Sequence, residues 1–338
     1  MDDDVLVLTG GDVLALLEGR DLEVVDAVSE AYEAHAAGLT ALPHSVFLTF
    51  PDRPSSRIIG LPAYVGGDLD LAGIKWVASF PANVEHGVER ASAVIVLNSM
   101  DDGRPICVME GSLVSARRTA ASAVLAVRSL HGDAQFGAVA MLGCGRINFE
   151  IARFLHTTRG AGFGILALDA DLERAQRFVA RCQAALPGVT AAVASSAVEI
   201  LRCPLVSIAT TAPAPHIDDL SPCRAGATIL HVSLRDIAPE AIVDCDNVVD
   251  DRDHVCRAQT SLHLAEQRRG DRSFIRCTLG EVLTGAAPAR RSAEGVTVFS
   301  PFGLGILDLV VAALVYRTAR ERGVGLLVAG FRPPSLAV

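Results

Sequence analysis

Apolar and polar positions follow a helical period over the first forty residues of the chain. Thr9 precedes one such segment, at residues 12–18, and Asp21 precedes a second, at residues 22–38. Thr and Asp are favoured N-cap residues, because their side chains accept hydrogen bonds from the first free N–H groups of a helix. The pattern therefore predicts two amphipathic helices, capped by Thr9 and Asp21.

The period then changes, and short apolar runs of strand length follow one another. These runs cover residues 46–50, 56–61, 71–78 and 93–97. They are separated by Pro, Gly and Asp residues, which are typical of tight turns. Consecutive strands joined by short turns predict an antiparallel sheet, and the alanine-rich segment 112–130 predicts a long helix after it.

Strand and helix patterns alternate in the second half of the chain. The predicted strands are residues 138–142, 163–168, 189–193, 204–209, 227–232 and 247–249, and the predicted helices are residues 146–157, 171–186 and 196–202. This alternation is typical of a parallel sheet with right-handed crossovers. It stops near Ser300, where residues 305–322 form one more apolar helix and residues 323–338 are expected to be a tail.

A glycine-rich turn lies between the first strand and the first helix of this half. Gly143-Cys-Gly145 follows the strand, and Arg146-Ile147-Asn148 begins the helix. Two such glycines permit a tight turn and bring N–H groups of the helix N-terminus close to a pyrophosphate. Asn148 stands where a third Gly or Ala is expected, so the fingerprint is incomplete.

Asp169 ends the second parallel strand of this half. A carboxylate there can hydrogen-bond the ribose 2′-OH of NAD, and it would repel the 2′-phosphate of NADP. We therefore predict an α/β protein with an NAD-binding Rossmann domain at residues 131–303. This domain is inserted into an α+β domain formed by both chain ends, residues 1–130 and 304–338.

Composition excludes several classes of function. Half of the 338 residues are hydrophobic and the net charge is −9, which disfavours nucleic acid and anionic membranes as partners. No apolar stretch is long enough to span a bilayer, and the acidic N-terminus does not resemble a signal peptide, so we expect a cytoplasmic protein. The eight cysteines form no Cys-x-x-Cys pair or Cys/His cluster, so we expect free thiols and no metal site.

Three further segments carry residues that suit chemistry. Lys75 interrupts an apolar strand, either as a functional cation or as an edge-strand residue that blocks pairing. Arg118 and Thr119 near a helix start suit an anion, although on these residues alone a solvated helix end is the favoured interpretation. Ser233 and Asp236 follow the fifth parallel strand, where ligands of such sheets bind, so we expect Asp236 at the cofactor crevice rather than as a simple turn residue.

These blocks together resemble the ornithine cyclodeaminase/mu-crystallin family over nearly the whole chain. The marks are Gly73-Ile-Lys75, Arg118-Thr119-Ala-Ala, Gly143-Cys-Gly145, Ala209-Thr210-Thr211-Ala-Pro213 and Asp236. The resemblance implies a homodimer that uses NAD(P), with a dimerisation and substrate domain made from both chain ends. Residues 56–64, 72–81, 110–112 and 299–305 are most similar to one branch, the N-(2-amino-2-carboxyethyl)-L-glutamate dehydrogenases.

The resemblance to this branch implies a reaction. NAD+ removes hydride from the glutamate Cα of the amino-acid substrate, and water then releases 2-oxoglutarate and L-2,3-diaminopropionate, a precursor of siderophores and peptide antibiotics. Asp236 is the expected general base for both steps. Lys75 is expected to hold a carboxylate or to tune Asp236 electrostatically.

The resemblance also implies binding roles for other residues. Arg57 and Arg118 are expected to bind substrate carboxylates, with Tyr64 beside them. Thr119 is expected at the pyrophosphate. The remaining cofactor positions are Gly143, Gly145, Arg146, Ile147, Asn148, Asp169, Arg118, Thr210, Thr211, Ser233, Ser300 and Gly303.

Two alternatives remain open. Within the family, the chain resembles cyclodeaminases, ketimine reductases and alanine dehydrogenases as well. The cyclodeaminases proper carry an Asp-x-Pro-Gly-Lys run, whereas Asp236 is followed by Ile-Ala-Pro-Glu, which argues against ornithine as substrate. The other class is a non-catalytic, crystallin-like ligand-binding protein, against which the presence of both Lys75 and Asp236 argues.

Overall fold

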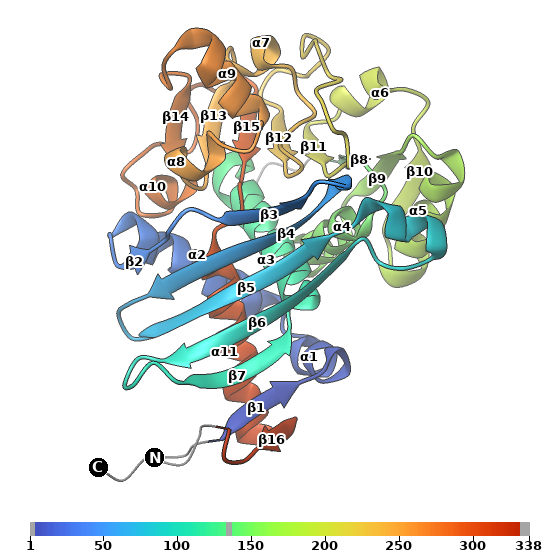
Figure 1. Ribbon diagram of the computed structural model, residues 1–338. Helices are drawn as coiled ribbons and strands as arrows, with labels where there is room; N and C mark the ends of the chain where they lie inside the picture. The colour runs from blue at the N-terminus through green and yellow to red at the C-terminus, as the bar shows by residue number, and fades with distance from the viewer. Residues whose placement is uncertain (1–3, 133–136, 332–338) are drawn as a thin grey trace. The chain divides into compact units, whose positions relative to one another are not determined.

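The chain divides into two compact units. The computed structural model describes residues 4–132 and 137–331 (Figure 1). Unit 1 comprises Met1–Arg118 and Leu304–Val338, and unit 2 comprises Thr119–Gly303. The division falls inside helix α3 (Ser112–Ala126), so Arg118 belongs to unit 1 and Thr119 to unit 2, whereas the sequence analysis placed this boundary at residue 130.

Unit 1 is built on a mixed sheet in the order β16-β1-β7-β6-β5-β4-β2, with β3 paired to β4. Its strands are β1 (Val5–Leu8), β2 (Thr40–Ala41), β3 (Val46–Phe50), β4 (Arg53–Val65), β5 (Leu71–Ser79), β6 (Ala91–Ser99), β7 (Pro105–Glu110) and β16 (Leu326–Val328). Strands β3 to β7 pair antiparallel, which confirms the prediction for β3 to β6, whereas the sequence analysis missed β1, β2 and β7. The predicted tail is wrong for β16, which pairs antiparallel with β1; residues 332–338 lie outside the described residues.

The helices of unit 1 are α1 (Gly10–Leu17), α2 (Asp21–Ala36), α11 (Gly305–Arg322), the first part of α3, and the short 3-10 helix η1 (Pro81–His86). Thr9 caps α1 as predicted, in a reciprocal pair of hydrogen bonds with Asp12. The cap predicted at Asp21 is wrong. Arg20 occupies that position, and the Asp21 carboxylate pairs with Arg117 at 2.8 Å inside the unit.

Helix α11 packs against α2 and against one face of the sheet, at β4, β5 and β6. The alternation of side chains along β5 turns Lys75 toward this covered face and Trp76 toward the other. A Cβ at Gly73 would lie 2.9 Å from the Leu309 side chain of α11, so a glycine lets helix and strand approach closely here. Ile95 and Leu97 are fully buried as a result.

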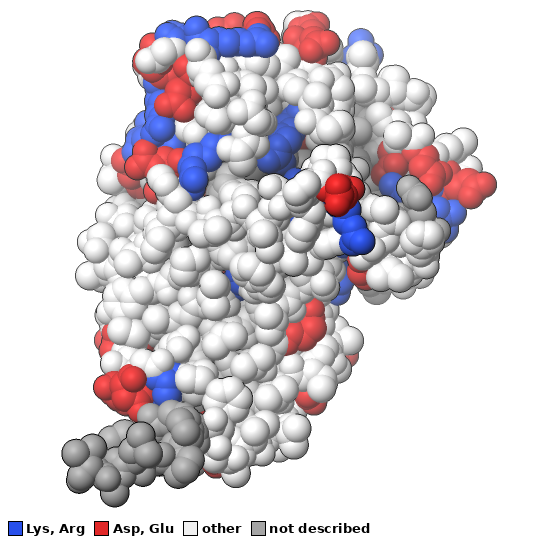
Figure 2. Space-filling model, in the orientation of Figure 1, with Lys and Arg blue, Asp and Glu red and all other residues white. Residues whose placement is uncertain are grey.

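The opposite face of the sheet carries exposed apolar side chains. The register places Val46, Gly60, Trp76 and Val94 in one row across four strands. Val46 is 63% exposed and Trp76 41% exposed. In Figure 1 no helix crosses in front of β4, β5 and β6 on this side, and Figure 2 shows few charged side chains over them. A sheet face of this kind is suited to protein–protein contact.

Unit 2 is an all-parallel sheet in the order β10-β9-β8-β11-β12-β15-β13-β14. Its strands are β8 (Ala138–Leu142), β9 (Gly164–Leu168), β10 (Thr190–Val193), β11 (Leu205–Ile208), β12 (Thr228–His231), β13 (Asp246–Val249), β14 (Ile275–Thr278) and β15 (Thr297–Ser300). The first five positions have the 3-2-1-4-5 order of dinucleotide-binding folds, which confirms the predicted Rossmann-type architecture. The sequence analysis missed β14 and β15.

Helices connect these strands. They are the end of α3 with its π-helical continuation η2 (Val127–His131), α4 (Arg146–Arg159), α5 (Leu172–Ala185), α6 (Ala197–Leu201), α7 (Pro239–Ile242), α8 (Arg252–Val255), α9 (Ser261–Arg269) and α10 (Leu279–Leu283). All eight cysteines are free thiols and seven are buried, as expected for small hydrophobic residues. Within the described residues no helix has the length and hydropathy to cross a membrane, and no acidic, His and Cys side chains are grouped as for a metal ion.

Candidate functional site

The two glycines of the turn in unit 2 have different roles: Gly143 permits a tight turn, and Gly145 leaves open space at the start of α4. Gly143 has φ +89°, and a Cβ there would lie 2.4 Å from the Ala209 carbonyl oxygen. Gly145 is the N-cap of α4, has no side-chain cap, and has open space where a Cβ would stand. The first turn of α4 therefore presents backbone N–H groups with room in front of them. This geometry fits a pyrophosphate at the switch point between β8 and β11.

Asp169 immediately follows β9, at the strand end where a ribose is expected. Its carboxylate accepts hydrogen bonds from the backbone N–H groups of Cys144 at 2.8 Å and Asp171 at 3.0 Å. The side chain thus ties the glycine turn to the second strand. Each carboxylate oxygen has a further lone pair, so the group can still accept a ribose hydroxyl.

Asn148 has a structural role that the sequence analysis did not foresee. It is fully buried, and its amide donates to the carbonyl oxygens of Leu142 at 3.0 Å and Gly143 at 2.7 Å. Its own oxygen accepts from Ser207 at 2.7 Å. Both side-chain amide hydrogens are used within the protein, so the Asn148 side chain fixes the glycine turn and has no amide hydrogen left for a cofactor.

The other cofactor positions of the sequence analysis lie in different surroundings. Arg146 and Ile147 form the first turn of α4, and Thr119 lies in the part of α3 that belongs to unit 2. Thr211 is exposed in the loop that follows β11. Thr210, in the same loop, instead turns its hydroxyl onto Asp236.

Asp236 is fully buried in unit 2, beyond the carboxyl ends of β11 and β12. Its carboxylate accepts hydrogen bonds from the hydroxyls of Thr210 and of Ser233, the latter at 2.5 Å. Two imidazoles are also close, with His216 Nε2 at 3.2 Å and His231 Nε2 at 3.4 Å. The loop 209–217 folds back so that the N–H of His216 donates to the Asp236 carbonyl oxygen at 2.8 Å.

These contacts decide the charge of Asp236. Burial raises the pKa of its carboxyl, but the hydrogen bonds from His231, Ser233 and Thr210 together hold the pKa well below its usual 3.8. The group is therefore ionised throughout the neutral range. A carboxylate with so low a proton affinity orients and stabilises donors more effectively than it removes protons.

His231 links Asp236 to the next strand. Its Nε2 lies 3.2 Å from the Asp236 backbone N–H, and its Nδ1 lies 3.4 Å from the Ser300 hydroxyl. Nε2 accepts the N–H when it is unprotonated and donates to the carboxylate when it is protonated. Ser300 therefore contacts His231 and is linked to Asp236 through that imidazole. The backbone N–H of Gly303 donates a hydrogen bond to the Asp250 carboxylate at 2.6 Å.

A second cluster of charges is buried in unit 1. The Lys75 ammonium contacts Asp308 of α11 at 2.6 Å and the Ser115 hydroxyl at 3.1 Å. Arg118 Nε contacts the other oxygen of Asp308 at 3.1 Å. Strand β5 lies between β4 and β6, so the edge-strand interpretation of Lys75 is wrong. Two cations share one acid here, which leaves one positive charge for an anion.

The protonation of Lys75 is finely balanced. Burial lowers its pKa most, the Arg118 charge lowers it further, and Asp308 raises it, for a resulting value of about 8. The ammonium is charged at neutral pH and loses its proton in mildly basic solution. The attraction of such a cation for an anion depends on pH.

Arg57 and Tyr64 lie on opposite faces of β4. Arg57 pairs with Ser79 of β5, and Lys75 is four residues earlier on β5, so both side chains are on the face that α11 covers in part. Tyr64 is on the other face, and its hydroxyl donates to Asp70 at 2.9 Å. The structure separates Tyr64 from Lys75 and Arg57, so Tyr64 does not join them in one substrate site.

Three residues of these clusters were missed by the sequence analysis. Asp308 is an acid within the apolar first turns of α11. Because a buried lysine such as Lys75 needs a buried acid, the sequence could have predicted Asp308 as its partner. His216 and His231 flank the stretch that leads to Asp236. Single histidines carry little information in sequence, and only the folded loop brings them to Asp236.

The chain is similar to known proteins over almost its whole length. The family model for the ornithine cyclodeaminase/mu-crystallin family matches residues 6–323. The N-((2S)-2-amino-2-carboxyethyl)-L-glutamate dehydrogenase of Staphylococcus aureus is 29% identical, over 96% of this chain and 98% of its own.

Two solved structures have the same fold over almost the whole chain. The Thermococcus litoralis Δ1-pyrroline-2-carboxylate reductase, in complex with NADH and L-proline, is 25% identical with a TM-score of 0.88, over 96% of this chain and all of its own. An archaeal alanine dehydrogenase dimer with bound NAD is 27% identical with a TM-score of 0.86, over 97% of this chain and all of its own.

Proposed function

The chain belongs to the ornithine cyclodeaminase/mu-crystallin family, and from this premise we propose that it is an NAD-dependent dehydrogenase of N-(2-amino-2-carboxyethyl)-L-glutamate. The substrate, NAD+ and water give 2-oxoglutarate, L-2,3-diaminopropionate, NADH and a proton. The observation that carries the proposal is the buried Lys75–Arg118–Asp308 cluster, whose excess positive charge suits an acidic amino acid. Diaminopropionate would supply siderophore or peptide-antibiotic biosynthesis.

The cofactor proposed for unit 2 is NAD. The room beside Gly145 and the first turn of α4 suit the pyrophosphate, and the Asp169 carboxylate suits an unphosphorylated ribose. Relatives with 25% and 27% identity were solved with NADH and NAD. Bound NAD+ would supply the hydride acceptor.

Residues of unit 1 would hold the substrate. Arg118 offers a planar fork to a carboxylate, and Lys75 adds a point charge that is present below a pKa of about 8. Asp308 keeps these two cations together without neutralising both. Arg57, on the same face of the sheet as Lys75, would bind a further carboxylate.

The Asp236 cluster of unit 2 would manage the protons. The substrate amine must lose a proton before hydride leaves, and water must lose one when the C–N bond is hydrolysed. Because its pKa is depressed, Asp236 is proposed to hold the imidazole of His216 at 3.2 Å, and His216, 44% exposed, would exchange protons with the substrate and water. This assignment modifies the expectation that Asp236 alone is the general base.

The chain is further proposed to be a homodimer. The row of Val46, Trp76 and Val94 leaves an apolar sheet face exposed in the single chain, and a second copy would cover it. One relative of 27% identity is described as a dimer.

The decisive experiment is a turnover assay with purified protein. N-(2-amino-2-carboxyethyl)-L-glutamate and NAD+ should yield NADH, 2-oxoglutarate and diaminopropionate in equal amounts. L-Alanine with NAD+, Δ1-pyrroline-2-carboxylate with NADH, and L-ornithine test the other activities of the family. Faster turnover of any of these would replace the proposed substrate, and no turnover with any substrate would favour a binding protein. Lys75→Met, which removes the buried cation, is the control for site-dependent activity.

A further inference from the structure

A second pair of cations lies at one end of the unit 1 sheet, away from Lys75. Arg57 of β4 is opposite Ser79 of β5, and Ser79 is opposite Ala91 of β6. Arg90 directly precedes Ala91, and its carbonyl oxygen accepts the Phe80 N–H at 2.8 Å. The register therefore brings Arg57 and Arg90 to the same end of three adjacent strands.

Neither arginine is neutralised within the part of the chain that the structure describes. Arg57 Nε is buried and has no hydrogen-bond partner there. The pKa of Arg90 is lowered, first by burial and then by the positive charge of Arg57, so the two guanidinium groups act on each other. Two like charges that are held together while partly buried are stabilised when an anion joins them.

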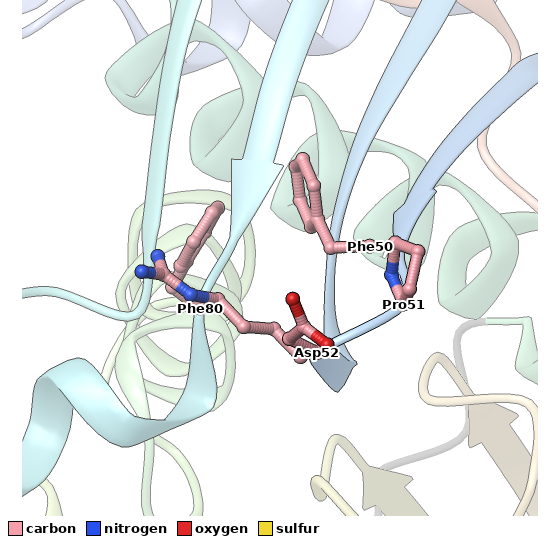
Figure 3. A pocket seen from close by; sticks show the side chains of 5 residues that line it. Phe50, Pro51, Asp52 and Phe80 are labelled. Carbon is pink, nitrogen blue, oxygen red and sulfur yellow. The ribbon is translucent and has the colours of Figure 1, made fainter.

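A hollow lies at the same end of the sheet, with a volume of about 260 Å³. Figure 3 shows Phe50 and Phe80 on its walls, with Pro51 and Asp52 from the turn between β3 and β4. The two phenyl rings are 5.8 Å apart, and Phe80 directly follows Ser79, which is opposite Arg57. Arg53 also lines the hollow, whereas Arg57 and Arg90 do not, so the hollow marks open space at this end of the sheet and is not the arginine pair itself.

The spacing to Lys75 limits what such a ligand can be. Lys75 and Ser79 are on the same face of β5, and four residues of a strand span about 13 Å. Lysine and arginine side chains that converge from positions this far apart can hold two acidic groups separated by a few methylene groups. A monocarboxylate could satisfy one cluster only.

We propose that Arg57 and Arg90 form a carboxylate subsite, distinct from the Lys75–Arg118–Asp308 cluster, that selects substrates with an additional carboxylate. The inference rests on the proposed function for the identity of the substrate. Of the three carboxylates of that substrate, the one on the reacting carbon belongs to the Lys75 cluster. The subsite holds one of the other two, the glutamate γ-carboxylate or the carboxylate of the amino-carboxyethyl arm.

The test pairs substrate analogues with arginine variants. Each of the two remote carboxylates is replaced in turn by a carboxamide, and kcat/KM is measured with the wild type and with Arg90→Gln. The wild type should prefer the parent substrate over one analogue by about 10- to 100-fold, mainly through KM, which is the range for a charged hydrogen bond. Arg90→Gln should abolish that preference. The analogue for which the preference disappears shows which of the two remote carboxylates the subsite binds.

The controls separate a local contact from general electrostatics. Arg104→Gln removes one charge from the turn beyond the other end of β6 and should leave the preference intact. Arg90→Lys keeps the charge without the fork and should restore the preference in part. An unchanged preference in Arg90→Gln for both analogues would overturn the subsite.

A binding measurement keeps this result independent of the reaction. Glutarate and the monocarboxylate butyrate are titrated calorimetrically into the NADH-loaded protein. Weaker glutarate binding in both Arg57→Gln and Arg90→Gln, with butyrate unchanged, would support the subsite even if the proposed substrate is not oxidised. Equal glutarate affinity in wild type and Arg90→Gln would refute the subsite and leave the proposed function standing.

Discussion

Asp308→Asn is expected to destabilise unit 1 strongly, because it removes the acid shared by two buried cations. The substitution keeps the shape of the side chain but leaves Lys75 and Arg118 facing each other in a site where Asp308 itself is fully buried. Breaking a buried ion pair from one side costs about 3–5 kcal/mol. In a unit of about 150 residues this corresponds to a fall in melting temperature of roughly 6–20 °C.

The loss should depend on pH in a defined direction. Asp308 raises the pKa of Lys75, so the attraction between them stabilises the fold while Lys75 is charged, below a pH of about 8, and is lost as the pH rises above it. The gap in melting temperature between wild type and Asp308→Asn should therefore be widest at neutral pH and narrower at pH values well above 8. At those pH values Lys75 is neutral, so Asp308→Asn removes only the ion pair between Asp308 and Arg118.

Thermal melts followed by circular dichroism at neutral and basic pH measure this gap. Glu321→Gln is the matched control, since it makes the same acid-to-amide change at an exposed position of α11 and should fall within about 0.5 kcal/mol of wild type. Adding Lys75→Met to the Asp308→Asn variant should recover part of the lost stability, because Lys75→Met removes one of the two unpaired cations. A neutral-pH melt of Asp308→Asn equal to that of the control would refute the reasoning.

Four further outcomes follow from the same structure. The KM for the substrate should rise as the pH passes about 8 and Lys75 loses its proton, and Lys75→Arg should shift this rise to higher pH. Asp169→Ala should weaken NAD binding more than NADP binding in fluorescence titrations of both cofactors. Asp236→Asn should lower kcat by about 10²–10⁴ with little change in NAD affinity, and turnover within a few fold of wild type would remove Asp236 from the mechanism. Trp76→Glu should convert a dimer to a monomer in light-scattering measurements, because it places a charge on the exposed apolar face.

Local patterns predicted the elements that depend on neighbouring residues. The cap at Thr9, the antiparallel strands β3 to β6, and the strand–turn–helix around Gly143 were all readable because each is fixed by contacts between segments that are close in sequence. The cap at Asp21 failed for a tertiary reason. Pairing with Arg117, far along the chain, holds its carboxylate inside the unit instead of at the helix end.

Longer-range features could not be read in the same way. A period of two tells which residues of a strand share a face, but it does not tell which strands become neighbours. The insertion of β15 between β12 and β13, and the pairing of β16 with β1, are set by packing between distant segments. Tyr64 is a different case, because the resemblance placed it with Arg57, although their odd separation within β4 puts the two side chains on opposite faces.

The charge of the whole chain says little about the charge that a ligand would meet. The net charge is −9, which by itself would repel a polyanionic substrate. Most of that charge is on the surface, where salt screens it within about 10 Å. Lys75 and Arg118 are buried, and their interactions are screened far less. In unit 1 the cations exceed the acids that pair with them at both the Lys75 cluster and the Arg57–Arg90 pair, so affinity for carboxylates arises from local burial within an acidic protein.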